Sequence, residues 1–293
     1  KLSLIHPKKA SKLLIVFIKD LSLVSKLSSV ILPFNPESLE TYDDNTFKLA
    51  IKFFPEILHR IKSSIIKIIL KTLPEFWLII TGGIPKLVLL AEFTADTAQE
   101  ANQTAQNAKE ALRKALGNKI KMRVSQSDEE TEEFWVIRRE SFSLLRKHVR
   151  GLRTAPFIDD FSVRADYLPE FLPKLYEILN RYKLMYTIAG HLGDGNFHII
   201  PLMDLTNPKS KEIIIKLSKE VYNLIIKFNG TITSEHNDGI IRTPFLLQMY
   251  GQKVCDLFAK TKQIFDPLNI FNPGKKVGGT FEYAENHINT QKV

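Results

Sequence analysis

Residues 190–198 form a glycine-rich segment with the sequence Gly-His-Leu-Gly-Asp-Gly-Asn-Phe-His. Two histidines, His191 and His198, flank its central glycines. The dipeptide Asp194-Gly195 favours a two-residue hairpin turn. Such a turn would place His191 opposite His198, because cross-strand partners lie about 4.5–5.5 Å apart at Cβ. Two imidazoles at that separation can share one metal ion. The segment therefore predicts half of a metal site.

A second polar element, Ser234-Glu235-His236, follows a short apolar run that resembles a strand. Glu235 would complete a site of two histidines and one carboxylate, which leaves coordination positions open for a substrate. His236 would stand beside the metal, where a general base is useful. The alternative is that all of these are ordinary polar loop residues. Two histidines around a glycine-rich turn, together with a Glu-His pair, favour the functional interpretation.

Strand and helix patterns alternate along the chain, which predicts an α+β fold with antiparallel sheets and helices packed on one face. Two rounds of strand and helix suggest a duplicated, ferredoxin-like substrate or cap domain, followed by a C-terminal helical segment. We expect an edge strand or extended segment at 31–40, strands at 13–18, 87–93, 120–124, 157–163, 186–189, 197–202 and 231–233, and helices at 21–30, 96–116, 127–148, 168–182 and 209–228.

The composition is that of an ordinary globular protein, because the 293 residues are 44% hydrophobic and 25% charged. No apolar run reaches the roughly eighteen residues of a membrane span. The net charge is +9, but the lysines are scattered and no nucleic-acid motif accompanies them, so we expect a solvated basic surface and no nucleic-acid partner. A single cysteine, Cys255, excludes an internal disulfide and fits a reducing, cytoplasmic compartment. It cannot hold an iron–sulfur cluster by itself.

One stretch, Pro55 to Trp77, combines isoleucines with histidine, arginine and lysines in an amphipathic pattern. A basic amphipathic helix can lie on an anionic membrane surface, which would make the protein peripheral at the inner face of a membrane. It can equally pack on a sheet while its lysines reach solvent. The packed helix is the preferred interpretation.

The Gly-His-x-Gly-Asp-Gly-Asn-x-His pattern at 190–198 resembles that of the C-terminal domain of FAD-linked oxidases, a family that includes D-lactate dehydrogenases, glycolate oxidase and D-2-hydroxyglutarate dehydrogenase. Glu235-His236 matches the Glu-His element of the family. Asp266-Pro267, followed by Asn272-Pro273-Gly274-Lys275, resembles its C-terminal signature. The order and spacing of the three motifs agree. Weaker similarity at residues 36–40, 92–93 and 135–138 extends the resemblance over nearly the whole chain.

The resemblance implies FAD as the cofactor and a divalent metal, zinc or manganese, held by His191, His198 and Glu235. It implies that His236 takes the proton of the substrate hydroxyl while the α-hydrogen leaves as hydride to the flavin. The metal would polarise the hydroxyl and fix the orientation of the substrate.

The resemblance also implies a site for an anionic substrate. Arg138 matches an arginine that binds the substrate carboxylate, a task suited to the forked guanidinium. Arg139 is the alternative if the register shifts by one residue. Three further residues are expected near the flavin: Asn196, Asn272 and Lys275.

Departures from the family pattern concern the substrate. Members selective for dicarboxylates carry a lysine where this chain has Ile158, a threonine near Phe142 and an asparagine at Ile200. The apolar replacements argue against a 2-hydroxyglutarate-type substrate. A smaller or more apolar 2-hydroxyacid, such as D-lactate, is therefore expected.

A further departure concerns the cofactor. The family holds the FAD pyrophosphate in a glycine-rich loop of a separate N-terminal domain, and neither Gly82-Gly83 nor Gly278-Gly279 provides that loop. We expect the chain to begin where that domain ends, with the FAD-binding domain and an unidentified electron acceptor as partners. The expected organisation is a substrate- and metal-binding domain at 1–240, with halves at about 1–125 and 126–240, and a helical segment at 241–293 that contacts the flavin domain.

Two other functions fit the residues less well. A metal-dependent hydrolase could use the two histidines and Glu235 to activate water. A non-enzymatic binding module could attach to a membrane through the segment 55–77. Turnover of a D-2-hydroxyacid with a dye acceptor would distinguish the dehydrogenase from both.

Overall fold

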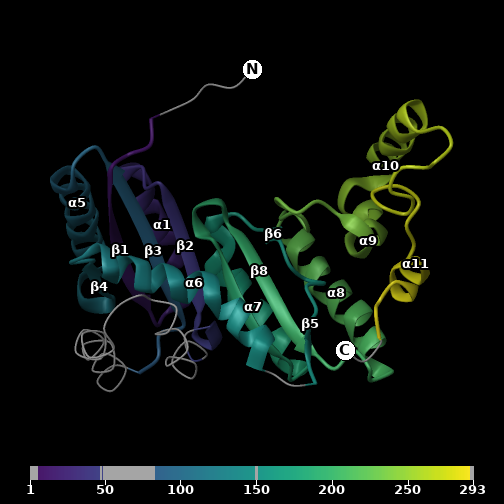
Figure 1. Cartoon of the computed structure of the whole chain (residues 1–293), viewed down its shortest axis with the longest axis horizontal. Coiled ribbons are helices and arrows are strands. Elements are labelled where there is room, and N and C mark those ends of the chain that lie inside the picture. Colours follow the sequence, from purple (N-terminus) through teal and green to yellow (C-terminus); the bar gives the residue numbers. More distant parts are fainter. Residues whose placement is uncertain (1–5, 47, 49–82, 149–150, 291–293) are drawn as a thin grey trace. The chain divides into compact units, whose positions relative to one another are not determined.

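The computed structural model describes residues 6–46, 48, 83–148 and 151–290 (Figure 1). The chain forms two compact units. The first unit consists of Lys1–His148 and Thr187–Gly195, and the second of Val149–Tyr186 and Asn196–Val293. The domain boundary at residue 240 stays a prediction. The basic amphipathic segment 55–77 lies outside the described residues.

The first unit is built on an antiparallel sheet with the strand order β4-β1-β3-β2-β7. Long helices accompany it, which confirms the α+β class. Its elements are β1 (Ala10–Ile18), α1 (Val24–Ile31), β2 (Ser38–Asp43), β3 (Leu87–Ala95), α5 (Ala98–Leu116), β4 (Lys121–Val124), α6 (Asp128–His148) and the end of β7 (Met185–His191).

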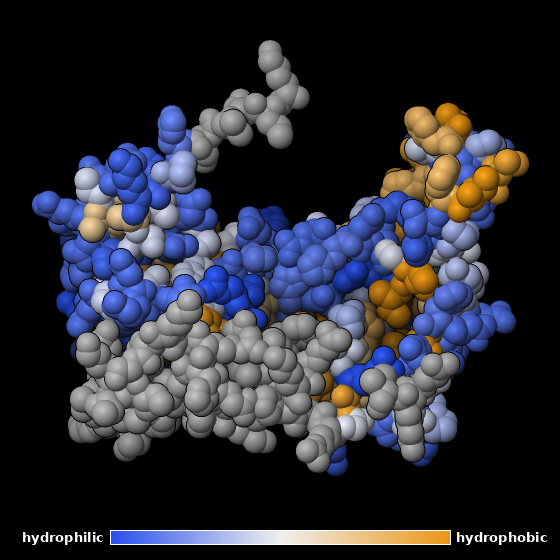
Figure 2. Space-filling view, in the orientation of Figure 1, coloured by the Kyte–Doolittle hydropathy of each residue, from blue (hydrophilic) through white to orange (hydrophobic). Residues whose placement is uncertain are grey.

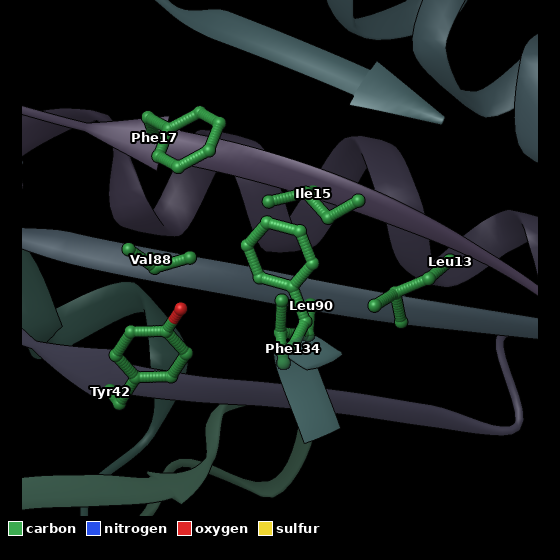
Figure 3. Close-up of a cluster of buried hydrophobic side chains, with 7 residues drawn as sticks. All are labelled: Leu13, Ile15, Phe17, Tyr42, Val88, Leu90 and Phe134. Atoms are coloured by element: carbon green, nitrogen blue, oxygen red, sulfur yellow. The ribbon is translucent and has the colours of Figure 1, made fainter. Parts of the chain in front are cut away.

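Strand β1 is apolar and buried from Leu13 to Ile18 because both of its faces are covered there. Leu14, Val16 and Ile18 are fully buried, and β1 contacts α5, whose buried alanines let it approach closely. The alternate side chains point to the opposite face of the sheet, where they form a cluster with Phe134 of α6 (Figure 3). We expected helices on one face only; in this unit α6 covers the other.

Strand β2 departs from the edge strand that Pro33 and Pro36 suggested. The strand begins at Ser38, after both prolines, and it pairs antiparallel with β3 on one side and with β7 on the other. The prolines lie in the preceding turn, where a missing N–H costs no ladder hydrogen bond. This central position brings Glu40 into register with His191.

In the second unit, β8 pairs antiparallel with β5 and β6, and α7 packs against α8. The core of this unit is rich in aromatic rings: Phe161 lies 5.6 Å from Phe171 and 6.0 Å from Phe197 between ring centroids. The elements are β5 (Arg153–Thr154), β6 (Phe161–Ser162), α7 (Leu168–Arg181), the start of β7, β8 (Asn196–Met203), α8 (Lys209–Lys227), α9 (Gly239–Arg242), α10 (Leu246–Phe265) and α11 (Phe281–Asn286).

The strand predicted at residues 157–163 was largely wrong. Phe157 and Ile158 are buried as the pattern required, but only Phe161–Ser162 is a strand. The break occurs at Asp160, whose φ of 60° lies in the left-handed region and cannot continue a strand. The strand predicted at 231–233 is likewise reduced to one bridge between Ser162 and Thr231.

The C-terminal part of the chain is helical, as expected. Gly251, with a φ of 75°, interrupts α10 and divides it into two parts. Among the described residues, none of the helices combines the length and the apolarity that a membrane span requires.

Candidate functional site

In the second unit, His198 of β8 lies beside Glu235 and His236 of the loop that follows α8. The Nε2 atom of His198 lies 3.1 Å from Oε1 of Glu235, and Nε2 of His236 lies 3.4 Å from the same oxygen. The two imidazole rings stack at 5.1 Å between centroids with 22° between their planes. Three of the residues predicted from sequence are therefore together: one ligand histidine, the ligand carboxylate and the base.

A carboxylate that the sequence interpretation gave no such role, Asp159, lies behind the two rings. Its Oδ1 is 2.9 Å from Nδ1 of His198, and its Oδ2 is 3.4 Å from Nδ1 of His236. The Asp159 side chain is 11% exposed, whereas Glu235 and His236 are about half exposed, at 47% and 48%. The imidazoles thus stand between a buried carboxylate and an accessible one.

The adjacent Asp160 holds the backbone of the Glu235-His236 loop. Its carboxylate accepts N–H bonds from Ser234 at 3.0 Å, from Glu235 at 3.0 Å and from His236 at 2.8 Å. Burial alone would raise the pKa of Asp160, but these backbone hydrogen bonds and the positive charge of Arg242 outweigh it and lower the pKa. Asp160 is therefore an ionised anchor for this loop.

A buried cation, Arg242 of α9, joins the two loops of the site. Its guanidinium donates to the backbone carbonyl of Asp159 and, at 2.8 Å, to that of Asn237. Asp238, which directly precedes α9 and is fully buried, forms an ion pair with Lys276. These contacts fix the loop directly after His236, and they lie within the second unit.

The ligand atoms in this unit have the chemistry and spacing of a divalent-metal site. One atom each from Asp160, His198, Glu235 and His236 lies within 4.8 Å of the others. In a tetrahedral zinc site with bonds of about 2.1 Å, donor atoms are about 3.4 Å apart, close to the 3.1 and 3.4 Å found around Oε1 of Glu235. Asp160 is the least suited to bind a metal, since its oxygens already accept several N–H bonds.

The glycine-rich turn does not form as a two-residue hairpin at Asp194-Gly195. Residues Leu192–Asp194 form a 3-10 turn, closed by a 3.1 Å hydrogen bond from the N–H of Gly195 to the carbonyl of Leu192. Gly195 adopts a φ of 65°, which glycine tolerates without steric cost. A Cβ on Gly193 would meet that of Leu39 at 3.4 Å, so the turn packs closely against β2.

His191, predicted as a metal ligand, belongs to the first unit. Its Nδ1 lies 2.6 Å from Oε1 of the buried Glu40. The other oxygen of Glu40 accepts N–H bonds from Arg138, at 3.2 Å from Nε and 3.0 Å from Nη2. Arg138 is thus anchored through Glu40, whereas the alternative, Arg139, pairs with Glu132 at the surface.

The three residues expected near the flavin have different surroundings. Asn196 is buried, and its amide donates to the Asp160 carboxylate and to the carbonyl of Phe161, both at 3.1 Å. Asn272 and Lys275 are exposed and bonded to each other at 3.2 Å. In the described structure Asn196 therefore supports the loop that carries Glu235, while the other two lie on the surface.

Sequence reasoning gave no site role to Glu40 or Arg242, and it did not anticipate that Asp159 contacts both imidazoles or that Asp160 anchors their loop. The only local signal was the doublet of carboxylates after a buried apolar run, since a buried carboxylate needs a charged or hydrogen-bonding partner. Arg242 and Glu40 carried no local signal, because their partners are distant in sequence.

The sequence matches the family described as "FAD linked oxidases, C-terminal domain" over residues 8–276. The chain belongs to this family. The glycine-rich turn, the Glu235-His236 loop and the segment around Asn272 all fall within the matched range. The expected FAD-linked oxidase C-terminal domain is therefore confirmed.

Several curated relatives of this FAD-linked oxidase domain are named as oxidases or dehydrogenases of hydroxyacids. The chain is 28% identical over 159 residues to glycolate oxidase subunit GlcD of Bacillus subtilis, a stretch that is 54% of this chain and 33% of that protein. It is 27% identical over 144 residues to D-2-hydroxyglutarate dehydrogenase of Escherichia coli, or 49% of this chain and 14% of that one. D-lactate dehydrogenase (cytochrome) of Arabidopsis thaliana mitochondria is 26% identical over 189 residues, 64% of this chain and 32% of that one.

Solved structures show the same fold. A p-cresol methylhydroxylase structure with substrate bound superposes with a TM-score of 0.63 at 15% identity, covering 94% of this chain and 54% of that one. The 4-ethylphenol oxidase of Gulosibacter chungangensis gives 0.59 at 13% identity, covering 93% and 55%. The chain thus spans about half of these proteins and a third or less of the curated relatives named above.

Proposed function

We propose that this chain is the substrate- and metal-binding part of a flavin-dependent D-2-hydroxyacid dehydrogenase that acts on a small, D-lactate-like acid. The observation that carries the proposal is a shared arrangement: His191 and His198 each have Nδ1 on a buried carboxylate, Glu40 and Asp159 respectively. A metal-binding histidine almost always has its second nitrogen on a carboxylate or carbonyl in this way. The family membership and the named relatives support the flavin chemistry.

In this proposal His191, His198 and Glu235 hold a divalent cation, zinc or manganese. Both histidines would bind through Nε2, since Nδ1 of each is directed at its carboxylate. Glu235 is half exposed, so its oxygens can reach a cation that remains accessible to substrate. A bound cation would polarise the substrate hydroxyl and fix its orientation.

His236 is the proposed base. Its Nδ1 is near Asp159 and its Nε2 lies 3.4 Å from Glu235, so it is adjacent to a proposed metal ligand. In the oxidation, the hydroxyl proton passes to His236 as the carbonyl forms, and the α-hydrogen leaves with its electron pair. FAD, when bound, accepts that hydride. The half-exposed His236 ring can then return its proton to solvent.

Arg138 is the proposed binding group for the substrate carboxylate. Glu40 holds its guanidinium by two N–H bonds, which restricts the rotamers of a long side chain before substrate arrives. The fully buried Ile158 precedes Asp159 and offers no charge for a second carboxylate. A monocarboxylate such as D-lactate therefore suits the site better than 2-hydroxyglutarate.

The C-terminal segment is the proposed contact surface for a flavin-binding domain. Figure 2 shows hydrophobic side chains gathered over α10 and the loop that follows it. Phe265 and Leu268 are 80% and 79% exposed, and Ile270 and Phe271 are both 66% exposed. Asp266 orders this apolar loop, because it accepts the N–H groups of Ile270 and Phe271 at 2.9 Å each. Exposed apolar patches of this kind mark interaction surfaces.

Flavin reduction tests the dehydrogenase. The gene product, purified from the cells that naturally express it, would be mixed anaerobically with D-lactate. The flavin absorbance at about 450 nm would then be followed. We expect bleaching with D-lactate, with less or none for L-lactate. Absence of bound flavin, or bleaching by neither acid, would overturn the assignment; ester or amide cleavage without flavin reduction would support a metal-dependent hydrolase instead.

Zinc titration of the 293-residue chain tests the ligand assignment separately. His191→Ala and His198→Ala should each weaken zinc binding by at least about tenfold, whereas His236→Ala should leave it within a few-fold. In the flavin-containing gene product, His236→Ala should abolish turnover. The surface variant Lys174→Ala, which removes an exposed pair with Glu170, serves as the control. If His236→Ala lost zinc and His191→Ala did not, His236 would be the third ligand and the proposed base would be wrong.

A further inference from the structure

We propose that Lys276 is a positioning residue for His236. Through its ion pair with the buried Asp238, it connects the loop that carries Glu235 and His236 to the C-terminal segment. That segment includes the proposed contact surface for the flavin-binding domain. The inference rests on the proposed function for the role of His236 as base. Lys276 itself touches neither substrate nor cofactor in this scheme.

The carboxylate of Asp238 is the group through which the loop is held. It lies directly before α9, and its side chain is completely buried. Apart from the ion pair with Lys276, neither carboxylate oxygen accepts a hydrogen bond within the described part of the chain. A buried carboxylate without a partner is costly. The ammonium group of Lys276 is therefore what stabilises a charge at this position of the loop.

The backbone of Lys276 is fixed separately from its side chain. Its N–H donates to the hydroxyl of Thr243 at 2.7 Å, and that hydroxyl donates to the carbonyl of Gly239 at 2.5 Å. A Cβ on Gly279 would meet Cγ2 of Thr243 at 2.8 Å, so this part of the C-terminal segment packs closely against the residue that follows α9. The segment thus contacts α9 through its backbone and the loop through the Lys276 side chain.

The other anchors of the loop are internal to the unit. Asp160 holds the N–H groups of residues 234–236, and Arg242 holds the carbonyl of the next residue. Both anchors are buried. The Lys276 side chain, in contrast, is 41% exposed, and its Nζ lies 5.4 Å from the centre of the Phe258 ring of α10. Lys276 therefore links the loop to the helix on which the proposed contact surface begins.

Loss of the ammonium group should move the loop. In Lys276→Met, the Asp238 carboxylate keeps its charge in a buried place and loses the cation that balances it. The charge is relieved when the loop opens and the carboxylate reaches water. His236 and Glu235 lie two and three residues before Asp238, so the same opening displaces the proposed base and the proposed metal ligand.

Hydrogen exchange of the 293-residue chain, free of metal and flavin, measures this opening. The amides of residues 234–238 should exchange at least about tenfold faster in Lys276→Met than in the wild-type chain, while amides of α7 and α8 keep their rates. Lys276→Arg should keep the slow exchange, because it retains the positive charge. Unchanged exchange at 234–238 in Lys276→Met would refute the positioning role.

Lys174→Met is the matched control. Lys174 also combines an ion pair, with Glu170, and a position over an aromatic ring, that of Phe228. Its partner differs from Asp238 in burial, because the Glu170 side chain is 67% exposed. Removal of this lysine leaves a carboxylate that water already solvates, so exchange at 234–238 should not change. Equal acceleration in both variants would show a general effect of lost charge and would overturn the proposal.

The double variant Asp238→Asn/Lys276→Met tests the pair even if Lys276→Met does not fold. It has no buried charge, but it also lacks the connection between loop and segment. We expect it to fold and still to exchange faster at 234–238. Once Asp238 is replaced, Lys276→Met should add less than about twofold to the rate, because both changes remove the same contact. Wild-type exchange in the double variant, or an equal effect of Lys276→Met with and without Asp238, would refute the connection.

Turnover by the flavin-containing gene product supplies a readout that lost stability alone would not give. Lys276→Met should lower kcat for D-lactate at least about tenfold through misplacement of His236. It should leave KM within about twofold, because Glu40 holds the proposed carboxylate-binding Arg138 in the first unit. Lys276→Arg should restore kcat. A raised KM with unchanged kcat would show that Lys276 binds substrate, and the positioning role would be wrong.

The two proposals can fail separately. If the exchange results held but the gene product neither bound flavin nor oxidised D-lactate, the connection through Lys276 would stand and the proposed dehydrogenase would fail. If D-lactate reduced the flavin while Lys276→Met kept wild-type exchange and kcat, the function would stand and the role of Lys276 would fail.

Discussion

Replacement of Asp160 by asparagine should loosen the Glu235-His236 loop. The carboxylate receives N–H bonds from Ser234, Glu235 and His236, and also from the amide of Asn196. Asparagine fits the same space but offers one acceptor oxygen in place of two. Whichever way the amide turns, at least one donor then faces an NH₂ group.

The cost can be worked out from these contacts. If the amide nitrogen takes the place of Oδ2, the N–H groups of Ser234 and His236 both lose their acceptor; if it takes the place of Oδ1, Asn196 does. A buried donor left without a partner costs about 1–3 kcal/mol, and the bonds that remain lose their charge assistance. We therefore expect Asp160→Asn to lower the free energy of unfolding by about 2–4 kcal/mol.

Urea unfolding at neutral pH, followed by circular dichroism, measures this loss. Hydrogen exchange of the amides of residues 234–236 shows whether the loop opens locally before the unit unfolds. Asp166→Asn is the control, since it removes the same charge from an exposed pair with Arg164, and such a pair contributes about 0–1 kcal/mol. A loss below about 1 kcal/mol for Asp160→Asn, with unchanged exchange at 234–236, would refute the anchoring role.

The pKa of Asp160 sets the sign of the pH dependence. Burial alone would raise this pKa, but the backbone hydrogen bonds from His236, Glu235 and Ser234 outweigh burial and lower it. A group whose pKa is lower in the folded state stabilises the protein above its unfolded pKa, about 3.9 for aspartate. That stability is lost as the pH falls through the folded pKa. Asp160→Asn should therefore remove part of the acid sensitivity of the wild-type chain, while lowering its stability at neutral pH.

Three further outcomes are expected. Burial raises the pKa of Asp43 to about 7, so between about pH 4 and 7 the folded state holds a proton that the unfolded state releases, and stability falls as pH rises through that window. Asp43→Asn should flatten this decline in a plot of Tm against pH; an unchanged slope would contradict it. Glu40→Gln should weaken zinc binding about tenfold through His191 and raise the KM for D-lactate through Arg138, and a variant equal to wild type in both would argue against the shared role. Phe271→Ser should reduce binding of a hydrophobic dye and of the flavin domain without lowering Tm, since Phe271 is 66% exposed; a large drop in Tm would show that it packs within the fold.

Much of the fold followed from local patterns. The helix predicted at 96–116 forms as Ala98–Leu116 and ends at Gly117, whose φ of 60° needs a glycine. The capping pattern at Ser127 and Glu130 forms too, with the N–H of Glu130 on the Ser127 hydroxyl at 3.3 Å and the Glu130 carboxylate on the N–H of Gln126 at 2.7 Å. Such features depend on residues a few positions apart, so sequence alone contains them.

Strand β2 and the break at Asp160 could not be predicted in the same way. The prolines before β2 argued for an edge, but its pairing with β7 depends on a segment about 150 residues later. The apolar run at 157–163 favoured a strand, and the left-handed conformation of Asp160 is stabilised by backbone N–H groups of residues 234–236. Tertiary contacts override local propensity at such positions.

By itself, the sequence determined which residue types could bind a metal and move a proton, because His191, His198, Glu235 and His236 stand in motifs of a few residues each. Only the tertiary structure decided how these groups are held. Glu40 meets His191 across 151 residues, and Asp159 meets His198 across 39. The orientation of an imidazole depends on the partner of its second nitrogen, and a partner that distant leaves no trace in the local pattern.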